Sequence, residues 1–320
     1  MAYRNYHKRK IADRELHPET QMMSYGYDPF LSEGSVKPPV FLTSTFAFRT
    51  AEDGAEFFDV VAGRKPLPEG ESAGLVYSRF NHPNLEIVED RLALLDDSEA
   101  AVVTSSGMSA IAAILLTFLR PGDCVVQSVP LYGGTETLIS KFLPEWGIRS
   151  EVIADGLSTR AIGAALEAAA QKGHVRMCYI ETPANPTNAL FDLEGLRSEI
   201  DAFEARHGYR PLSVCDNTLL GPLYQKPSRQ GIDLSVYSLT KYIGGHSDLV
   251  AGGVTGTRAL ITKIRSFRST LGSQLDPHSS WMITRSMETL VLRMQQAARS
   301  GSAVARWLAE AGAATGVSVA

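Results

Sequence analysis

A lysine and an aspartate, each closing or directly following an apolar run, define the chemistry that this sequence can support. Lys241 follows the strand-like run 233–240, and Asp216 ends the similar run 211–216. A lysine amine can form a Schiff base with the aldehyde of pyridoxal phosphate. A carboxylate can keep the pyridine nitrogen protonated, so that the ring accepts electrons. The pair therefore predicts a pyridoxal 5'-phosphate enzyme with Lys241 and Asp216 as catalytic residues.

Such a site also needs groups that hold a phosphate. The stretch 104–109, Thr-Ser-Ser-Gly-Met-Ser, lies between a predicted strand and a predicted helix. Its glycine lets the backbone approach an anion, and the first N–H groups of the helix favour negative charge. Ser238 and Thr240 flank Lys241 and offer two further hydroxyls. Both stretches are equally compatible with ordinary capped turns, since Ser and Thr are common helix caps.

Three further side chains have the chemistry to hold the rest of such a cofactor. Tyr132, beside two glycines, offers a flat face for stacking on a pyridine ring. Asn185 lies in the proline-rich loop 181–186, which would aim its amide at a ring substituent. Arg79, two residues after Tyr77, is suited to a second phosphate clamp. A core tyrosine and a plain surface turn are the alternatives for Tyr132 and Asn185. The histidines show no metal-ligand spacing, so no metal site is predicted.

The elements that must position these residues alternate along the middle of the chain. Apolar residues at helical spacing predict helices at about 84–95, 109–119 and 161–171. Short apolar runs predict strands at 100–104, 124–127, 152–154, 177–180, 212–215 and 236–238. This alternation predicts an α/β fold with a mostly parallel sheet covered on both faces. Ligands of such sheets lie at the carboxyl ends of the strands, where Asp216 and Lys241 fall.

The two ends of the sequence have a different character. Residues 1–75 look irregular, which predicts an arm that cannot fold alone and is either disordered or laid against another subunit. The basic cluster at 4–14 predicts a solvated arm rather than a membrane or nucleic-acid tail. A helical pattern follows Leu275 and continues to Trp307, with Asp276 as its cap and Pro277 at its first position. Residues 317–320 are predicted to begin a strand of a further layer.

We therefore divide the chain into an arm contacting a neighbouring subunit (1–78), a cofactor domain (79–275) and the start of an incomplete C-terminal domain (276–320).

The composition, 44% hydrophobic and 21% charged with a net charge of −4, is that of a globular protein without a nucleic-acid footprint. Three separated cysteines predict reduced core thiols. The longest apolar run, 110–119, is too short to span a bilayer, and no signal peptide is evident. We expect a cytoplasmic protein that binds neither nucleic acid nor membrane.

Taken in order, the motifs resemble the pyridoxal-phosphate enzymes of cysteine and methionine metabolism. This trans-sulfuration family includes cystathionine γ-synthase, the cystathionine lyases, methionine γ-lyase and the homoserine sulfhydrylases. The matching stretches are 77–79, 105–108, 132–135, 181–186, 216–218, 238–248 and 276–294. The resemblance implies a three-layer α/β/α fold of the aspartate aminotransferase type, with an N-terminal arm and a partial C-terminal α/β domain.

The resemblance also implies roles for matching residues. Lys241 would be the Schiff-base lysine, Asp216 the pyridinium partner, and Tyr132 the ring-stacking and proton-handling tyrosine. The phosphate would be held by Ser106, Gly107, Met108, Ser238 and Thr240, and Asn185 would contact the ring hydroxyl. Tyr77 and Arg79 would reach the phosphate of the adjacent subunit. A homodimer would then be the smallest active unit, and a homotetramer the usual assembly.

The implied activity is γ-elimination or γ-replacement on sulfur-containing or O-acylated amino acids. An aminotransferase of the same fold, and a cofactor-binding chain without turnover, are the alternatives. Family members usually continue further and carry an arginine that grips the substrate carboxylate. That clamp is absent here or lies beyond this sequence. Gly134 stands where methionine γ-lyases typically carry a cysteine, which favours the other members of the family.

Overall fold

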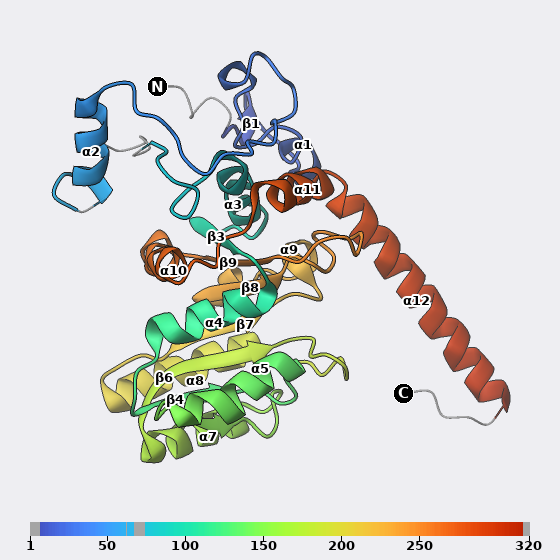
Figure 1. Cartoon of the computed structure of the whole chain (residues 1–320). Helices are drawn as coiled ribbons and strands as arrows, with labels where there is room; N and C mark the ends of the chain where they lie inside the picture. Colours follow the sequence, from blue (N-terminus) through green and yellow to red (C-terminus); the bar gives the residue numbers. More distant parts are fainter. Residues whose placement is uncertain (1–6, 62, 67–73, 316–320) are drawn as a thin grey trace.

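The computed structural model describes residues 7–61, 63–66 and 74–315, and a seven-stranded sheet forms its centre (Figure 1). The strands lie in the order β3-β9-β8-β7-β6-β4-β5. Their bounds are β3 Ala100–Thr104, β4 Asp123–Gln127, β5 Arg149–Val152, β6 His174–Glu181, β7 Leu212–Asp216, β8 Leu234–Ser238 and β9 Gly252–Gly256. Strands β4 to β8 pair in parallel, whereas β9 is antiparallel to both β8 and β3. The predicted mostly parallel sheet is confirmed.

Helices cover both faces of the sheet, because successive strand residues point to opposite sides. On one face, α4 (Gly107–Phe118) and α10 (Arg258–Leu271) enclose a core with Val102, Val214 and Val254. The opposite face is covered in two parts. Helices α7 (Thr159–Lys172) and α8 (Leu193–His207) pack there on β4, β6 and β7, and α3 (Pro83–Leu95) and α11 (Pro277–Met287) pack beside β3 and β8. The predicted three-layer α/β/α fold is confirmed.

Shorter helices connect these elements. They are α5 (Gly133–Thr137), a π-helical turn (Leu138–Phe142), α6 (Leu143–Glu145), α9 (Gly221–Tyr224) and a 3-10 turn (Pro227–Gln230). Helix α4 begins at Gly107 rather than near Ser109, because the Ser106 hydroxyl accepts a hydrogen bond from Ser109 N at 3.0 Å and caps the helix.

Two predicted elements were wrong in their extent. Strand β5 covers 149–152 and not 152–154, because it is an edge strand that pairs only with β4 and carries polar residues that an apolar-run search passes over. The helical stretch after Leu275 is interrupted at 288–289, so that α11 ends at Met287 and α12 (Leu290–Thr315) follows it. Asp276 caps α11 as predicted, accepting from Ser279 N at 2.9 Å.

The N-terminal arm is more ordered than its sequence indicates. It contains a two-stranded pair, β1 (Lys10–Ile11) and β2 (Arg14–Glu15), a turn of helix α1 (Pro18–Gln21), a 3-10 turn (Pro29–Leu31) and α2 (Ala51–Val61). Met22 and Tyr25 are buried in the core formed with α3 and α11 of the same chain. The first part of the arm is therefore not disordered, because buried apolar side chains anchor it to its own chain. The predicted contact of the arm with another subunit stays a prediction.

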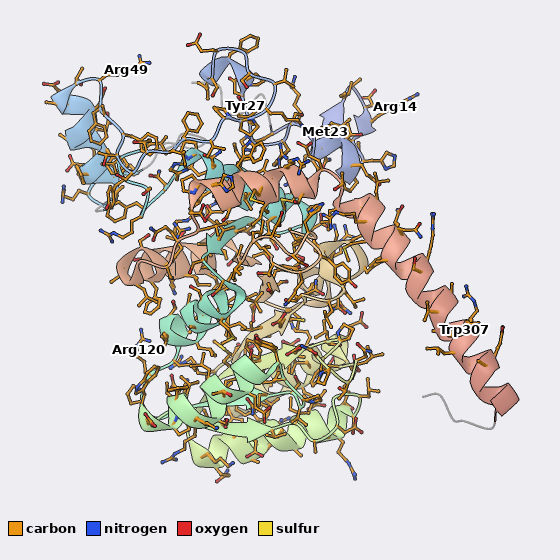
Figure 2. The ribbon with its side chains drawn as sticks, turned by 45° about the vertical axis from the view of Figure 1, so that its right-hand side comes forward. Arg14, Met23, Tyr27, Arg49, Arg120 and Trp307 are labelled. Atoms are coloured by element: carbon orange, nitrogen blue, oxygen red, sulfur yellow. The ribbon has the colours of Figure 1, made fainter. Side chains whose placement is uncertain are left out.

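Helix α12 runs outward from the rest of the molecule (Figure 1). Its first turns are anchored by Leu290, Val291 and Met294, which are buried. Farther along, Val304 and Trp307 are exposed, and Figure 2 shows Trp307 on the projecting part of the helix. The predicted strand at 317–320 falls outside the described residues.

The three cysteines are free and buried, as predicted. Burial raises the pKa of the Cys124 thiol to about 11 and that of Cys178 to about 12. Among the described residues, no helix is both long and apolar enough to cross a membrane.

Candidate active site

A cavity of about 290 Å³ lies at the carboxyl edge of the parallel strands. All the predicted site residues except Tyr77 and Arg79 line it, namely Ser106, Gly107, Met108, Tyr132, Asn185, Asp216, Ser238, Thr240 and Lys241. Glu181, Thr218, Leu219, Val236, Ile111 and Val250 complete the lining. Residues from six separate stretches of the chain therefore meet at the place where α/β sheets bind ligands.

The two principal residues come from neighbouring strands. Asp216 ends β7, and Lys241 follows β8, which pairs with β7 in parallel. Asp216 is buried, whereas Lys241 is exposed in the cavity. Within the described residues, the Lys241 amine has no hydrogen-bond or ion-pair partner, and Asp216 has no cationic one. The amine is thus available for a bond to a ligand.

Asp216 is held in place by neutral donors. Its Oδ1 accepts hydrogen bonds from Thr218 N at 3.1 Å and from Thr218 Oγ1 at 2.6 Å, and Tyr179 donates to Oδ2 at 3.5 Å. Burial raises the pKa of Asp216 despite these bonds. A buried carboxylate gains most from a cation placed beside it, and a protonated pyridine nitrogen is such a group.

The start of α4 forms the opposite end of the cavity. A Cβ added to Gly107 would lie 3.0 Å from Ser238 Cβ and 3.1 Å from Ser238 Oγ, so any larger residue would push Ser238 away by a few tenths of an ångström. The approach brings the Ser238 hydroxyl to the uncapped N–H groups of the first turn, which is a suitable setting for a phosphate. Thr240 lines the same cavity, but its Oγ1 already bonds Ala251 O at 3.2 Å and Ala251 N at 3.0 Å.

Tyr132 and Asn185 lie on separate loops that border the cavity. Tyr132 precedes α5 and is 44% exposed, so it is not the core tyrosine of the alternative interpretation. A Cβ at Gly134 would lie 2.8 Å from both Met108 Sδ and Tyr132 Cε1. A larger residue at position 134 therefore requires both of these side chains to move.

Tyr77 and Arg79 do not reach the cavity of their own chain. Arg79 donates to Ser269 O at 2.5 Å, and its guanidinium lies 4.6 Å from the centre of the Phe80 ring. Tyr77 is 40% exposed. Their predicted contact with an adjacent subunit stays a prediction.

Sequence reasoning missed two polar residues of the cavity. Glu181 is 6% exposed, ends β6 and pairs in register with Asp216. The strand-end argument that selected Asp216 applies equally to it. Thr218 bridges the site, since its Oγ1 donates to Asp216 Oδ1 and accepts from Ser238 N at 2.8 Å. The motif 216–218 was noticed, but no role was given to its threonine.

These residues fit pyridoxal phosphate. One cavity holds a free amine, a buried carboxylate without a cation, and a helix start closed by a glycine–serine contact. Together with the three-layer fold of the aspartate aminotransferase type, they define a pyridoxal-phosphate-dependent enzyme.

Comparison with known proteins gives the family. Residues 19–319 match the family described as Cys/Met metabolism PLP-dependent enzyme. The L-methionine gamma-lyase of Pseudomonas deceptionensis is 37% identical over 291 residues, covering 90% of this chain and 68% of that protein. The O-succinylhomoserine sulfhydrylase of Pseudomonas aeruginosa is 35% identical over 276 residues, covering 86% of this chain and 63% of that protein. The chain belongs to this family of cysteine and methionine metabolism.

A solved structure supports the same family membership. The cystathionine gamma synthase from Xanthomonas oryzae pv. oryzae, in complex with aminoacrylate and cysteine, superposes with a TM-score of 0.73. It is 29% identical in sequence, and the match covers 87% of this chain and 65% of that one. The chain thus spans about two thirds of the length of these relatives.

Proposed function

We propose that this chain carries out γ-elimination or γ-replacement on sulfur-containing or O-acylated amino acids. The observation that carries the proposal is the position of Lys241 and Asp216, at the ends of adjacent parallel strands and in one cavity. Membership of the Cys/Met metabolism family narrows the chemistry to trans-sulfuration. The named activities of relatives, a methionine gamma-lyase and a sulfhydrylase, include both elimination and replacement.

Each residue has a distinct task in this reaction. Bound in the cavity, pyridoxal phosphate supplies an electron sink for the carbanion at the substrate α-carbon. The Lys241 amine would hold the cofactor aldehyde and, when free, would take and return the α-carbon proton. Asp216 would keep the pyridine nitrogen protonated. Tyr132 would stack on the ring and handle a proton, and Asn185 would contact the ring hydroxyl.

The phosphate is held by the start of α4 and the facing strand end. Ser106, Gly107 and Met108 present backbone N–H groups, and Ser238 adds its hydroxyl at close range. Thr240 would add its hydroxyl by turning it from Ala251, to which both the hydroxyl and the Thr240 backbone N–H are bonded. The substrate is a small amino acid, and the chain works in the cytoplasm, where its three buried thiols stay reduced.

A substrate assay tests this function. Chain reconstituted with pyridoxal phosphate is given L-methionine, cystathionine, or O-succinylhomoserine with cysteine. We expect keto acid with ammonia from one of the first two, or a thioether product from the third. Pyridoxamine phosphate accumulating with an amino donor would favour an aminotransferase instead. A covalently bound cofactor whose spectrum does not respond to any amino acid would indicate binding without turnover.

We further propose that the active unit is a homodimer, within a homotetramer, in which Tyr77 and Arg79 complete the phosphate site of the neighbouring subunit. The support is that both residues lie outside the cavity of their own chain, while Arg79 carries a charge suited to a phosphate. An Arg79→Ala chain mixed with a Lys241→Ala chain should then regain activity. In a mixed dimer, one of the two sites has both residues intact, so up to about half of the parent activity is expected on symmetry grounds.

Complementation is measured after subunit exchange has been verified with two differently tagged chains. Each variant alone sets the baseline. A mixture of Lys241→Ala with Lys263→Ala, a substitution of an exposed lysine, sets the upper limit. No recovery in dimers that have exchanged subunits would place Arg79 in its own subunit or outside any site.

A further inference from the structure

Glu181, which has no role in the function proposed above, connects two loops that border the cavity. Its Oε2 accepts a hydrogen bond from Tyr132 N at 2.5 Å, and its Oε1 accepts one from Asn185 N at 2.9 Å. The first loop follows β4, and the second follows β6. One side chain therefore uses both carboxylate oxygens to join the backbone that carries the ring-stacking tyrosine to the backbone that carries the ring-contacting asparagine.

The carboxylate is itself fixed firmly. Glu181 is 6% exposed and ends β6, and its backbone N–H donates to Ser128 Oγ at 3.0 Å. Since Ser128 follows β4, this bond ties the two strand ends directly beneath the loops. A charged acceptor makes stronger hydrogen bonds than a neutral one, and a buried acceptor held by its own strand loses little entropy in making them.

We propose that Glu181 is a positioning residue, which sets the spacing of the Tyr132 and Asn185 loops and thereby shapes the cavity for the cofactor ring before it binds. The proposal rests on the proposed cofactor site but on no particular substrate. Glu181 lines the cavity, yet its two oxygens are already used by the backbone, so its action on the cofactor passes through Tyr132 and Asn185.

The two hydrogen bonds from Glu181 to the loops depend on its charge. Their strength should therefore change with pH, which a purely structural role would not produce. Burial, and next the charge of Asp216 on β7, raise the pKa of Glu181 to about 7. Tyr179 on β6 and Cys215 on β7 also lie near enough to interact with its charge, and Lys241, beyond β8, lines the same cavity. When the carboxyl is protonated, one oxygen becomes an O–H donor and a much weaker acceptor, and the carboxyl loses the charge that strengthens both hydrogen bonds.

The direction of the pH effect follows from this change in the carboxyl group. Above about pH 7 the carboxylate accepts from both loops as a charged group, and below it protonation weakens these bonds. In the cofactor-free chain, we expect hydrogen-exchange protection of the Tyr132 and Asn185 amides to fall as the pH decreases through 7, after correction for the intrinsic exchange rate. This measurement on the parent chain needs no variant that might misfold.

The variant test uses Glu181→Gln, which has the same shape but replaces one acceptor with an amide NH₂ that faces an N–H donor. We expect exchange at Tyr132 or Asn185 to accelerate about tenfold or more at pH 8, and the dissociation constant of pyridoxal phosphate to rise by a similar factor. The pH step of the parent should be missing in this variant.

Asp233→Asn is the matched control, because Asp233 also bridges to a backbone N–H, that of Ser213 at 2.8 Å, outside the cavity. It should alter exchange around Ser213 and weaken the ion pair with Arg210, but leave protection at Tyr132 and Asn185 and the cofactor affinity unchanged. Parent-like protection at both loops and parent-like cofactor affinity in Glu181→Gln would overturn the proposal, as would a parent chain without a pH step. Neither readout involves turnover, so a failed substrate assay would leave this test intact.

Discussion

A chain carrying Lys241→Ala is expected to hold no cofactor covalently and to lose its turnover. The Lys241 amine is exposed in the cavity and has no partner among the described residues, so it is placed to bond the cofactor aldehyde. The same amine moves the α-carbon proton in the proposed reaction. Removing a group that acts as proton carrier alone costs about 10²–10⁴-fold in rate, and losing the covalent bond adds to this.

The measurement is borohydride reduction followed by denaturation and mass analysis. The parent chain should gain the mass of the reduced cofactor on the peptide that contains Lys241, and the Lys241→Ala chain should gain none. Lys263→Ala, an exposed lysine on α10, is the control and should behave as the parent does. A cofactor adduct that persists in the Lys241→Ala chain would remove Lys241 from its assigned role.

The catalytic pair could be predicted from sequence because it depends on local rules. An apolar run followed by a polar residue predicts a strand that ends at the edge of a sheet, and parallel strands bring their ends together. Asp216 and Lys241 satisfy this rule, and β7 and β8 prove to be neighbours. The rule says nothing about which polar residues act through the backbone. Glu181 satisfies it too, but its bonds to Tyr132 and Asn185 depend on how two loops fold back.

Strand β9 could not be predicted by the same rule, since its sequence is Gly-Gly-Val-Thr-Gly and glycine disfavours strands. Its glycines allow close packing that only the assembled sheet creates, against backbone at Gly252 and Gly256 and against a leucine side chain at Gly253. A Cβ at Gly253 would lie 2.7 Å from Leu92 Cδ2, and one at Gly256 would lie 2.8 Å from Asp233 O. A Cβ at Gly252 would collide with Ser106 O, directly before the phosphate-binding turn. The missed strand thus supports the predicted site.

The arm shows the limit of periodicity as a guide. Helix α2 was missed although its apolar residues keep a helical face, the Thr50 hydroxyl accepts from Asp53 N at 3.1 Å at its start, and acidic residues follow in its first turn. Met22 and Tyr25 are buried through contacts with α3 and α11, which are far away in sequence. Such contacts are invisible to local patterns.

Asp216→Asn should leave cofactor binding nearly intact and severely reduce turnover. The phosphate contacts and Lys241 are untouched, so we expect the dissociation constant to change by less than about tenfold, the loss of roughly one hydrogen bond. A neutral amide cannot keep the pyridine nitrogen protonated, however, and the ring then becomes a poor electron sink. We expect the turnover rate to fall by roughly 10²–10⁴-fold, as for loss of a proton-controlling group.

The fold should tolerate this change. Asn keeps an oxygen that can accept from Thr218 N and Thr218 Oγ1, so the link from Thr218 to Ser238 N is preserved. Burial raises the pKa of Asp216 in the folded chain above its value in the unfolded chain. The folded chain therefore loses stability as the pH rises from the unfolded-state pKa through the folded-state pKa. Asn removes that cost. The cofactor-free variant should therefore melt no lower than the parent at pH 8.

Three measurements separate these effects: cofactor titration, steady-state turnover with the best substrate, and thermal melting of the cofactor-free chain. Asp233→Asn makes the same chemical change outside the cavity and should retain parent turnover. Because the variant is expected to fold and to bind cofactor, a fall in turnover alone reports on the electronic role of the carboxylate. Full activity in Asp216→Asn would show that the pyridine nitrogen is protonated by another group, or that the reaction does not need its proton.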